Sequence, residues 1–398
     1  MELTPGLRRE PPPDLDAVGQ DDDLVARIHA EIASSGPITF ARFMELALYD
    51  PAGGYYRSDT ARPGREGDFL TAPETHPIFG AALARGIEEV WVRLGRPDRF
   101  VLREYGAGTG TLALAILDGL ARDGSDLVAA LRYDPVEIEP RRLDTIAERL
   151  ATVGRQEVLV DPAERGQSVV GLVLANEVLD ALPTHRVVVR DGRLREVLVD
   201  SVEGRFVDVA ADPTTSALAG RLADEGIELT EGQRGEVCLA VDAWVAGAAA
   251  GLRRGLLLVI DYGHPATELY DPRRRRDGTL LAYLRQRAHD DPYRHVGRQD
   301  VTAHVDVTAV ERAAAEAGLA HLGSTTQAEF LVGLGIEDRL RAIQADPTTR
   351  LEAYLAVRSG LMRLLDPAAT GRFRVMGFGR DWPDGPPLAG FVYRLGRR

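Results

Sequence analysis

The sequence predicts an α/β fold built on a parallel, doubly wound sheet. Short apolar runs that suit buried strands alternate with runs of helical periodicity along the middle of the chain. The first such strand, Val101 to Glu104, leads directly into a loop with Gly106, Gly108 and Gly110, and then into an apolar helical run. A strand that turns abruptly into a helix needs glycine, because the backbone reaches positive φ and a ligand must approach it closely. We therefore expect the fold to be organised around this glycine loop.

Length and charge exclude several classes of protein. The chain has 398 residues, which suits one large α/β core with additions, or two domains. Its net charge of −13 argues against nucleic acid as a partner, because neutralising phosphates requires a basic surface. No run approaches the roughly 18 apolar residues of a membrane span, so we expect none.

Residue usage narrows the chemistry further. The sequence contains no lysine, so all 48 basic residues are arginine and lysine has no catalytic role. The single Cys238 excludes disulfides and a cysteine metal cluster, and we expect no metal site. The acidic, proline-rich start resembles neither a signal peptide nor an arginine-rich transit peptide, which leads us to expect a cytoplasmic protein.

Before the glycine loop, the pattern indicates helices. We expect residues 1–23 to be a disordered lead and residues 24–95 to form a helical lid or substrate-binding region. Apolar residues recur at helical spacing from Leu24 to Ser34 and from Ile38 to Tyr49, with Thr39 as the expected cap. Two later loops are rich in aromatic residues, Asp and Thr. They either cover the glycine loop or only join helices.

Residues 96–184 are expected to form the first half of the core sheet. Four strand-like runs in this stretch each end at polar residues. Ligands of such sheets bind beyond the carboxyl ends of the strands, at the point where the strand order reverses. We expect the following strand-end residues to meet in one crevice: Glu104, Glu137, Asp161, Asn176 and Glu177.

The second half of the chain combines an insertion with a return to the core. Residues 185–235 change to an alternating pattern that predicts an antiparallel β insertion. Residues 236–330 are expected to complete the core, with a helix-like run from Thr279 to His289, and residues 331–398 to form a C-terminal extension. The expected turns of the insertion are Asp191-Gly192 and Glu203-Gly204.

The spacing in the glycine loop favours one class of ligand. A dinucleotide fingerprint places its third glycine one position later, where this chain has Thr111. An acidic residue followed by Gly-x-Gly-x-Gly instead suits a ligand with a ribose and a charged amino-acid tail, of which S-adenosylmethionine is the common example. A dinucleotide and a purely structural turn are the alternatives.

Several further blocks of sequence stand out along the chain. They are Tyr49-Asp-Pro with Gly54-Tyr-Tyr56, Gly67 to Glu74, Glu104 to Gly110, Ala175 to Pro183, Asp261 to His264, Asp300 to Asp306 and Gln327 to Leu331. With these blocks the chain resembles the MidA-like family of class I S-adenosylmethionine-dependent methyltransferases. The resemblance implies a Rossmann-like seven-stranded sheet with an N-terminal helical lid, an antiparallel β insertion and a C-terminal helical extension.

The resemblance also implies a cofactor and an acceptor. The cofactor is S-adenosyl-L-methionine. Mitochondrial members of the family methylate an arginine of a subunit of respiratory complex I and assist its assembly, so the expected acceptor is an arginine side chain of a partner protein. The alternatives are a small biosynthetic metabolite as acceptor, or an assembly protein that binds the donor without turnover. A homodimer is a further expectation left open.

Roles for the donor-binding residues follow from this interpretation. We expect the glycine backbone to lie against the methionine and ribose of the donor, Glu104 near its α-ammonium, and Glu137 to accept both ribose hydroxyls. Asp161 either contacts the adenine amino group or caps its loop. Phe69 and Thr71 are expected to exclude water from the donor. The full set is Phe69, Thr71, Glu104, Gly106, Gly108, Gly110, Glu137, Asp161 and Asn176.

The expected catalytic residues would act on the acceptor. Carboxylates can orient a guanidinium by forked hydrogen bonds, which suits Glu177 and Asp180, three positions apart after a strand. His304 and Asp306 could form a His–Asp pair that accepts a proton. Structural roles are the alternative for all four residues.

Overall fold

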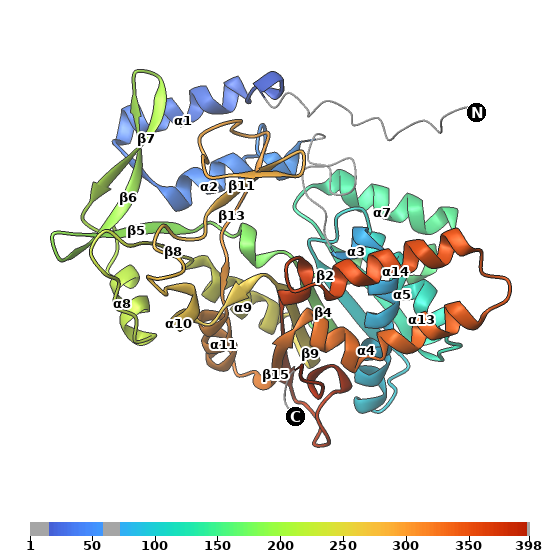
Figure 1. The fold of residues 1–398 in the computed structure, drawn as a ribbon. Coiled ribbons are helices and arrows are strands. Elements are labelled where there is room, and N and C mark those ends of the chain that lie inside the picture. The colour runs from blue at the N-terminus through green and yellow to red at the C-terminus, as the bar shows by residue number, and fades with distance from the viewer. Residues whose placement is uncertain (1–15, 59–71, 396–398) are drawn as a thin grey trace, which may run out of the picture.

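The computed structural model describes residues 16–58 and 72–395, and its centre is a six-stranded sheet (Figure 1). The strand order is β15-β16-β9-β4-β2-β3. The pairs β3–β2, β2–β4 and β4–β9 are parallel, as the alternation of strands and helices predicts. The strands are β2 Phe100–Tyr105, β3 Leu131–Val136, β4 Val169–Asn176, β9 Leu252–Asp261, β15 Ala320–Thr326 and β16 Arg374–Arg380.

The sheet differs from the expected seven-stranded one in two ways. The place of a seventh strand beside β3 holds a single parallel bridge between Tyr133 and Leu159. The run is cut short because Pro162 lacks the N–H that a continued ladder needs. In addition, the sheet is mixed, since β16 is antiparallel to both β9 and β15. β16 comes from the region expected to be a C-terminal extension, so that region contributes a core strand.

Helices cover both faces of this sheet. Leu102, Leu172 and Leu256 from three neighbouring strands face α4, α5, α7 and α14, which Figure 1 shows together on one side. The adjacent residues Val101, Val173 and Leu257 face α9 and α11, as the period of two in a strand requires. The helices are α4 Ile78–Arg93, α5 Thr111–Arg122, α7 Pro140–Thr152, α9 Ala240–Ala250, α11 Val307–Glu316, α12 Gln327–Gly333, α13 Ile336–Ala345 and α14 Leu351–Leu365.

A second, antiparallel sheet lies beside the core with the N-terminal helices. The hairpin turns at Asp191-Gly192 and Glu203-Gly204 are confirmed, and all four of these residues have positive φ, as in two-residue hairpin turns. Helices α1 (Asp22–Ser35) and α2 (Phe40–Tyr49) bury Leu24 and Phe43 against Val199 of this sheet. Its strands are β1 Ile38–Thr39, β5 His185–Arg190, β6 Arg193–Val202, β7 Arg205–Ala211 and β8 Arg234–Val237.

Two sequence-based expectations about local structure are wrong. The run from Thr279 to His289 is a hairpin, not a helix, because Arg285 and Gln286 both have positive φ and reverse the chain. Part of the expected disordered lead is ordered, since Asp21 caps α1 by accepting a hydrogen bond from the backbone of Leu24. The small sheet of this hairpin consists of β11 Leu281–Leu284, β12 Arg287–His289 and β13 Asp300–Thr302.

Short elements complete the described part of the chain. Within it, no helix has the length and hydrophobicity needed to cross a membrane. The remaining elements are α3 Ala72–Thr75, α6 Leu127–Ala130, α8 Ala217–Asp224, α10 Ala266–Leu269, β10 Gly263–His264, β14 Val305–Asp306, and the short 3₁₀ turns η1 Asp16–Val18, η2 Tyr55–Arg57, η3 Gln156–Val158, η4 Pro162–Glu164, η5 Leu179–Ala181, η6 Thr370–Arg372 and η7 Ala389–Phe391.

Candidate functional site

The glycine loop opens into a pocket of about 420 Å³ at the carboxyl edge of the core sheet. Residues at the ends of β2, β3 and β4 form its floor, and α2, η2 and α9 supply its walls. This is the crevice that the order of strands and helices predicts. Of the expected donor-binding residues, Glu104, the first two loop glycines, Glu137 and Asn176 line it, and so does Glu177.

The glycine loop has the backbone that its sequence predicts. Gly106, Gly108 and Gly110 have φ of 64°, 58° and 75°, a region that side chains rarely adopt. Gly110 does not line the pocket, and a β-carbon there would meet Ile146 at 3.2 Å, so this glycine allows close packing of the helices. Around Gly108 the nearest atom to an added β-carbon lies 4.0 Å away, which leaves the backbone open to a ligand.

Glu137, at the end of β3, is held against the glycine loop. Its Oε1 accepts a hydrogen bond of 2.6 Å from the backbone N–H of Gly108, and the guanidinium of Arg142 lies 3.7 Å away. Burial raises the pKa of Glu137, and Arg142 opposes this shift. The carboxylate is therefore fixed at the floor of the pocket by two elements.

Glu104 is the most deeply buried carboxyl group of the pocket. Its side chain accepts a 2.6 Å hydrogen bond from the hydroxyl of Tyr133, and the residue is 3% exposed. Burial raises its pKa to about 7, although the hydrogen bond from Tyr133 acts in the opposite direction. A cationic group in the pocket would offset this cost of burying a charge.

Asn176 and Glu177 form a sharp turn at the end of β4. Glu177 has φ of 54°, which is unusual for a residue with a side chain and marks a strained position. Its Oε1 accepts hydrogen bonds from the backbone N–H of Ala72 at 2.9 Å and from Nδ2 of Asn176 at 3.1 Å. Oδ1 of Asn176 is buried and has no hydrogen-bond partner among the described residues. The pocket thus contains an acceptor atom suited to a ligand donor.

Asp261, at the end of β9, holds this turn in place. Its Oδ2 accepts hydrogen bonds from the backbone N–H groups of Val178 at 3.1 Å and Leu179 at 2.8 Å, and its Oδ1 accepts one from Tyr262 at 2.8 Å. The residue is fully buried, and burial raises its pKa. Asp261 is therefore a structural residue that positions the segment after Glu177.

Aromatic residues line both the floor and the walls of the pocket, and the sequence pattern indicated no individual role for them. The rings of Tyr49 and Tyr56 stack with centroids 5.6 Å apart, and Trp244 of α9 lies edge-on to Tyr105 at 5.3 Å. All four residues line the pocket. The cluster of aromatic residues beside glycines at 49–56 was the available signal for the tyrosines. Trp244 stands in an apolar run that gives no such signal.

Three expected catalytic residues lie in a different place. Asp180, His304 and Asp306 line a separate cavity of about 20 Å³, behind the turn η5, which is large enough for about one water molecule. Asp180 is buried, and burial raises its pKa to about 6 while a hydrogen bond from the hydroxyl of Tyr262 lowers it. Glu177 is the only one of the four expected catalytic residues that lines the pocket of the glycine loop.

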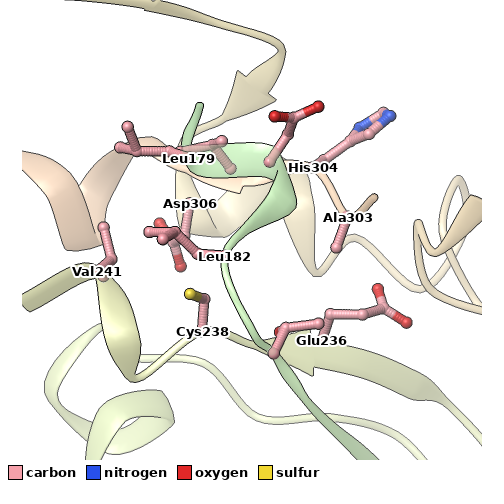
Figure 2. Close-up of a pocket in the computed structure, with 11 residues that line it drawn as sticks. Leu179, Leu182, Glu236, Cys238, Val241, Ala303, His304 and Asp306 are labelled. Carbon is pink, nitrogen blue, oxygen red and sulfur yellow. The ribbon is translucent and has the colours of Figure 1, made fainter. Parts of the chain in front are cut away.

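The expected His304–Asp306 pair is not formed. Asp306 caps α11, because its Oδ1 accepts a 3.2 Å hydrogen bond from the backbone N–H of Ala309. Figure 2 shows the ring of His304 pointing away from Asp306, and its Nδ1 has no hydrogen-bond partner in the described part of the chain. Burial and the nearby His264 and Arg275 lower the pKa of His304 to about 3, so the ring is neutral.

Of the remaining expected site residues, only Asp161 is described, and it does not line the pocket. Asp161 is exposed and caps the turn η4 by accepting a 2.8 Å hydrogen bond from the backbone N–H of Ala163, which is the structural alternative of the sequence analysis. Phe69 and Thr71 lie outside the described residues. No group of three or more His, Cys, Asp or Glu residues suited to a metal ion occurs within residues 16–58 and 72–395.

The residues of the pocket fit S-adenosylmethionine. The open backbone at Gly108 allows close contact, and Glu137 offers carboxylate oxygens to ribose hydroxyls. Oδ1 of Asn176, which has no partner among the residues that the structure describes, can accept a hydrogen bond. Glu104 supplies negative charge for an ammonium group.

Comparison with known proteins agrees with this geometry. Residues 82–325 match the family described as "Putative S-adenosyl-L-methionine-dependent methyltransferase". The protein arginine methyltransferase NDUFAF7 homolog of Drosophila melanogaster is 31% identical over 385 residues, which cover 89% of this chain and 84% of that protein. Human NDUFAF7 is 29% identical, over 87% and 81% of the two chains.

A solved structure matches nearly the whole fold. It is the crystal structure of a protein from Burkholderia thailandensis bound to S-adenosyl-homocysteine, with 35% identity and a TM-score of 0.85. The match covers 97% of this chain and 99% of that one. Family, fold and pocket thus agree, and the chain belongs to the MidA-like family of S-adenosylmethionine-dependent methyltransferases.

Proposed function

We propose that this methyltransferase transfers the methyl group to an arginine side chain of a partner protein. The observation that carries the proposal is the charge of the pocket. Among the described residues, its lining includes four carboxylates, Glu45, Glu104, Glu137 and Glu177, and one guanidinium, that of Arg142. Such a lining favours cationic ligands. The curated relatives named above, which are called protein arginine methyltransferases, support the same acceptor.

Glu104 and Glu137 suit the donor, and Glu177 is then the carboxylate that we assign to the acceptor. S-adenosylmethionine supplies a methyl group carried on a positively charged sulfur. A guanidinium has a pKa above about 12 and is a poor nucleophile while protonated. Glu177, held at the end of β4 by two hydrogen bonds to its Oε1, can accept a hydrogen bond from the guanidinium and stabilise its charge.

The transfer itself needs alignment more than covalent help from the protein. A bond forms between an acceptor nitrogen and the methyl carbon, the bond from that carbon to sulfur breaks, and the nitrogen releases one proton. Holding the three reacting atoms in line is the main contribution of the pocket. Glu177 is the carboxylate at the end of β4 that we assign to receive the proton.

The test is transfer of a labelled methyl group to a pool of arginine-containing peptides, with a citrulline pool as the neutral counterpart. We expect methylarginine from the first pool only. Glu177→Gln should lower kcat by about 10²-fold while the calorimetric affinity for S-adenosylmethionine changes little. Glu148→Gln, an exposed change on α7, is the matched control. If the protein methylates small metabolites and methylates neither peptide pool, the arginine acceptor is refuted.

A further inference from the structure

Two tyrosines of the pocket wall are held with their rings, not their hydroxyls, available to a ligand. The hydroxyl of Tyr49 donates a 2.8 Å hydrogen bond to the backbone carbonyl of Ala181. The hydroxyl of Tyr56 donates a 2.8 Å hydrogen bond to Oδ1 of Asp300 on β13. Both hydroxyls are thus engaged by the protein while both residues line the pocket. The surface that the two tyrosines contribute is therefore mainly aromatic carbon.

The position of the pair is rigidly defined. The rings stack at 5.6 Å with an angle of 30° between their planes, and Tyr55 packs edge-on against Tyr56 at 5.1 Å. Burial raises the pKa of Tyr49 and of Tyr56, so both rings stay neutral at physiological pH. A rigid, neutral aromatic surface attracts cations through the ring quadrupole.

An acidic residue stands beside this surface. Glu45 and Tyr49 are four positions apart on α2 and therefore lie on the same face of the helix, where both line the pocket. The side chain of Glu45 is 53% exposed and pairs with Arg42 at 2.8 Å. Glu45 thus marks the solvent side of the pocket, while Glu177 lies at its floor at the end of β4.

We propose that Tyr49 and Tyr56 form the acceptor-binding wall of the pocket and bind the guanidinium of the substrate arginine by cation–π contact, with Glu45 at the rim. This inference rests on the proposed function, because it assigns the recognition of the same acceptor. It makes the two tyrosines specificity-determining residues, since a neutral side chain of similar shape gains no cation–π attraction. Their ring surface, and not their hydroxyl groups, carries the selectivity.

The test measures binding of two peptides to the protein loaded with S-adenosyl-homocysteine. The probes are acetyl-Gly-Arg-Gly-amide and the matching citrulline peptide, titrated by calorimetry. We expect the arginine peptide to bind at least about tenfold more tightly than the citrulline peptide. Tyr56→Leu and Tyr49→Leu should weaken arginine binding about three- to thirtyfold, the range of one cation–π contact. Tyr56→Phe and Tyr49→Phe, which keep the ring, should stay within about twofold of wild type.

The affinity for S-adenosyl-homocysteine separates this inference from other roles of the tyrosines. We expect it to be unchanged in all four variants. Should the leucine variants lose it in parallel with arginine binding, the tyrosines belong to the donor site. Glu45→Gln is an exposed change that leaves the core intact, and it should weaken arginine binding about twofold at low salt. This variant replaces a leucine variant in the test if that leucine variant does not fold.

The outcomes also distinguish the inference from the function on which it rests. If the wild-type protein prefers arginine and the leucine variants bind it equally well, the aromatic wall is refuted while the arginine acceptor stands. If the wild-type protein binds both peptides equally, the arginine acceptor fails and the inference fails with it. Equal losses in the phenylalanine and leucine variants would assign the effect to the hydroxyls.

Discussion

Replacing Glu104 by glutamine should stabilise the protein without donor while weakening donor binding. Glu104 is 3% exposed, and burial raises its pKa from 4.5 to about 7. In the folded protein this carboxyl keeps its proton to a higher pH than in the unfolded chain. Its contribution to stability is therefore present at low pH and is lost as the pH rises through about 7. Glutamine keeps an oxygen that can accept the hydrogen bond from Tyr133 and carries no charge.

The magnitude follows from the size of the shift. About 7 minus 4.5 is about 2.5 pH units, which corresponds to at most about 3.4 kcal/mol of unfolding free energy at high pH. At pH 5.5 the folded carboxyl is still protonated, and the same relation gives a cost of about 1.4 kcal/mol. The stability advantage of Glu104→Gln over wild type should thus grow by about 2 kcal/mol between pH 5.5 and 8.5.

The assay is urea unfolding of both proteins, without donor, at pH 5.5, 7 and 8.5. Calorimetric titration with S-adenosylmethionine at the same pH values gives the second half of the prediction. Wild-type affinity should fall below pH 7, as Glu104 gains a proton, whereas the variant should bind weakly throughout. A stability difference that does not change with pH would refute the assigned cost of burying this charge.

Three further changes test other parts of the structure. Gly108→Val should abolish binding of S-adenosylmethionine in calorimetry, because valine at φ of 58° strains the loop by on the order of 1–3 kcal/mol and fills the backbone approach; an unchanged Kd would contradict the assigned donor site. Asp306→Ala should lower the unfolding free energy by about 1 kcal/mol in urea titration, through loss of the α11 cap, with kcat unchanged. A large fall in kcat with intact folding would restore Asp306 as a catalytic candidate. Asp134→Ala should lower the unfolding free energy by about 3 kcal/mol in urea titration, because it removes the counter-ion of a buried guanidinium. That guanidinium belongs to Arg103 and lies 2.7 Å from Asp134. A loss below about 1 kcal/mol would mean that the other contacts of Arg103 suffice.

The parts of the site that were predictable are those encoded over a few residues. A strand followed by Gly-x-Gly-x-Gly requires positive φ, and all three glycines have it. Likewise, strand-end acids such as Glu104 and Glu137 must reach one edge of a parallel sheet, because the strands share a direction. These features depend on local sequence and on a general rule of sheet topology.

The wrong predictions of catalytic residues concern side chains whose orientation depends on tertiary packing. Asp180 follows Glu177 by three positions, yet the 3₁₀ turn held by Asp261 carries it to a separate cavity. His304 and Asp306 are close in sequence, but the start of α11 uses Asp306 as a cap. Sequence spacing does not encode which side of a turn a side chain faces, since distant residues decide it.

The sequence by itself determined the glycine loop and the parallel half of the sheet, because glycine conformations and apolar strand runs are local properties. Only the tertiary structure decided which aromatic residues line the pocket. Trp244 of α9 is far in sequence from Tyr49 and Tyr56, and all three residues line one pocket only in the folded chain. The same holds for β16, which enters the core between β9 and β15 from the end of the chain. Such contacts arise from the burial of whole helix and strand faces, which no short stretch of sequence specifies.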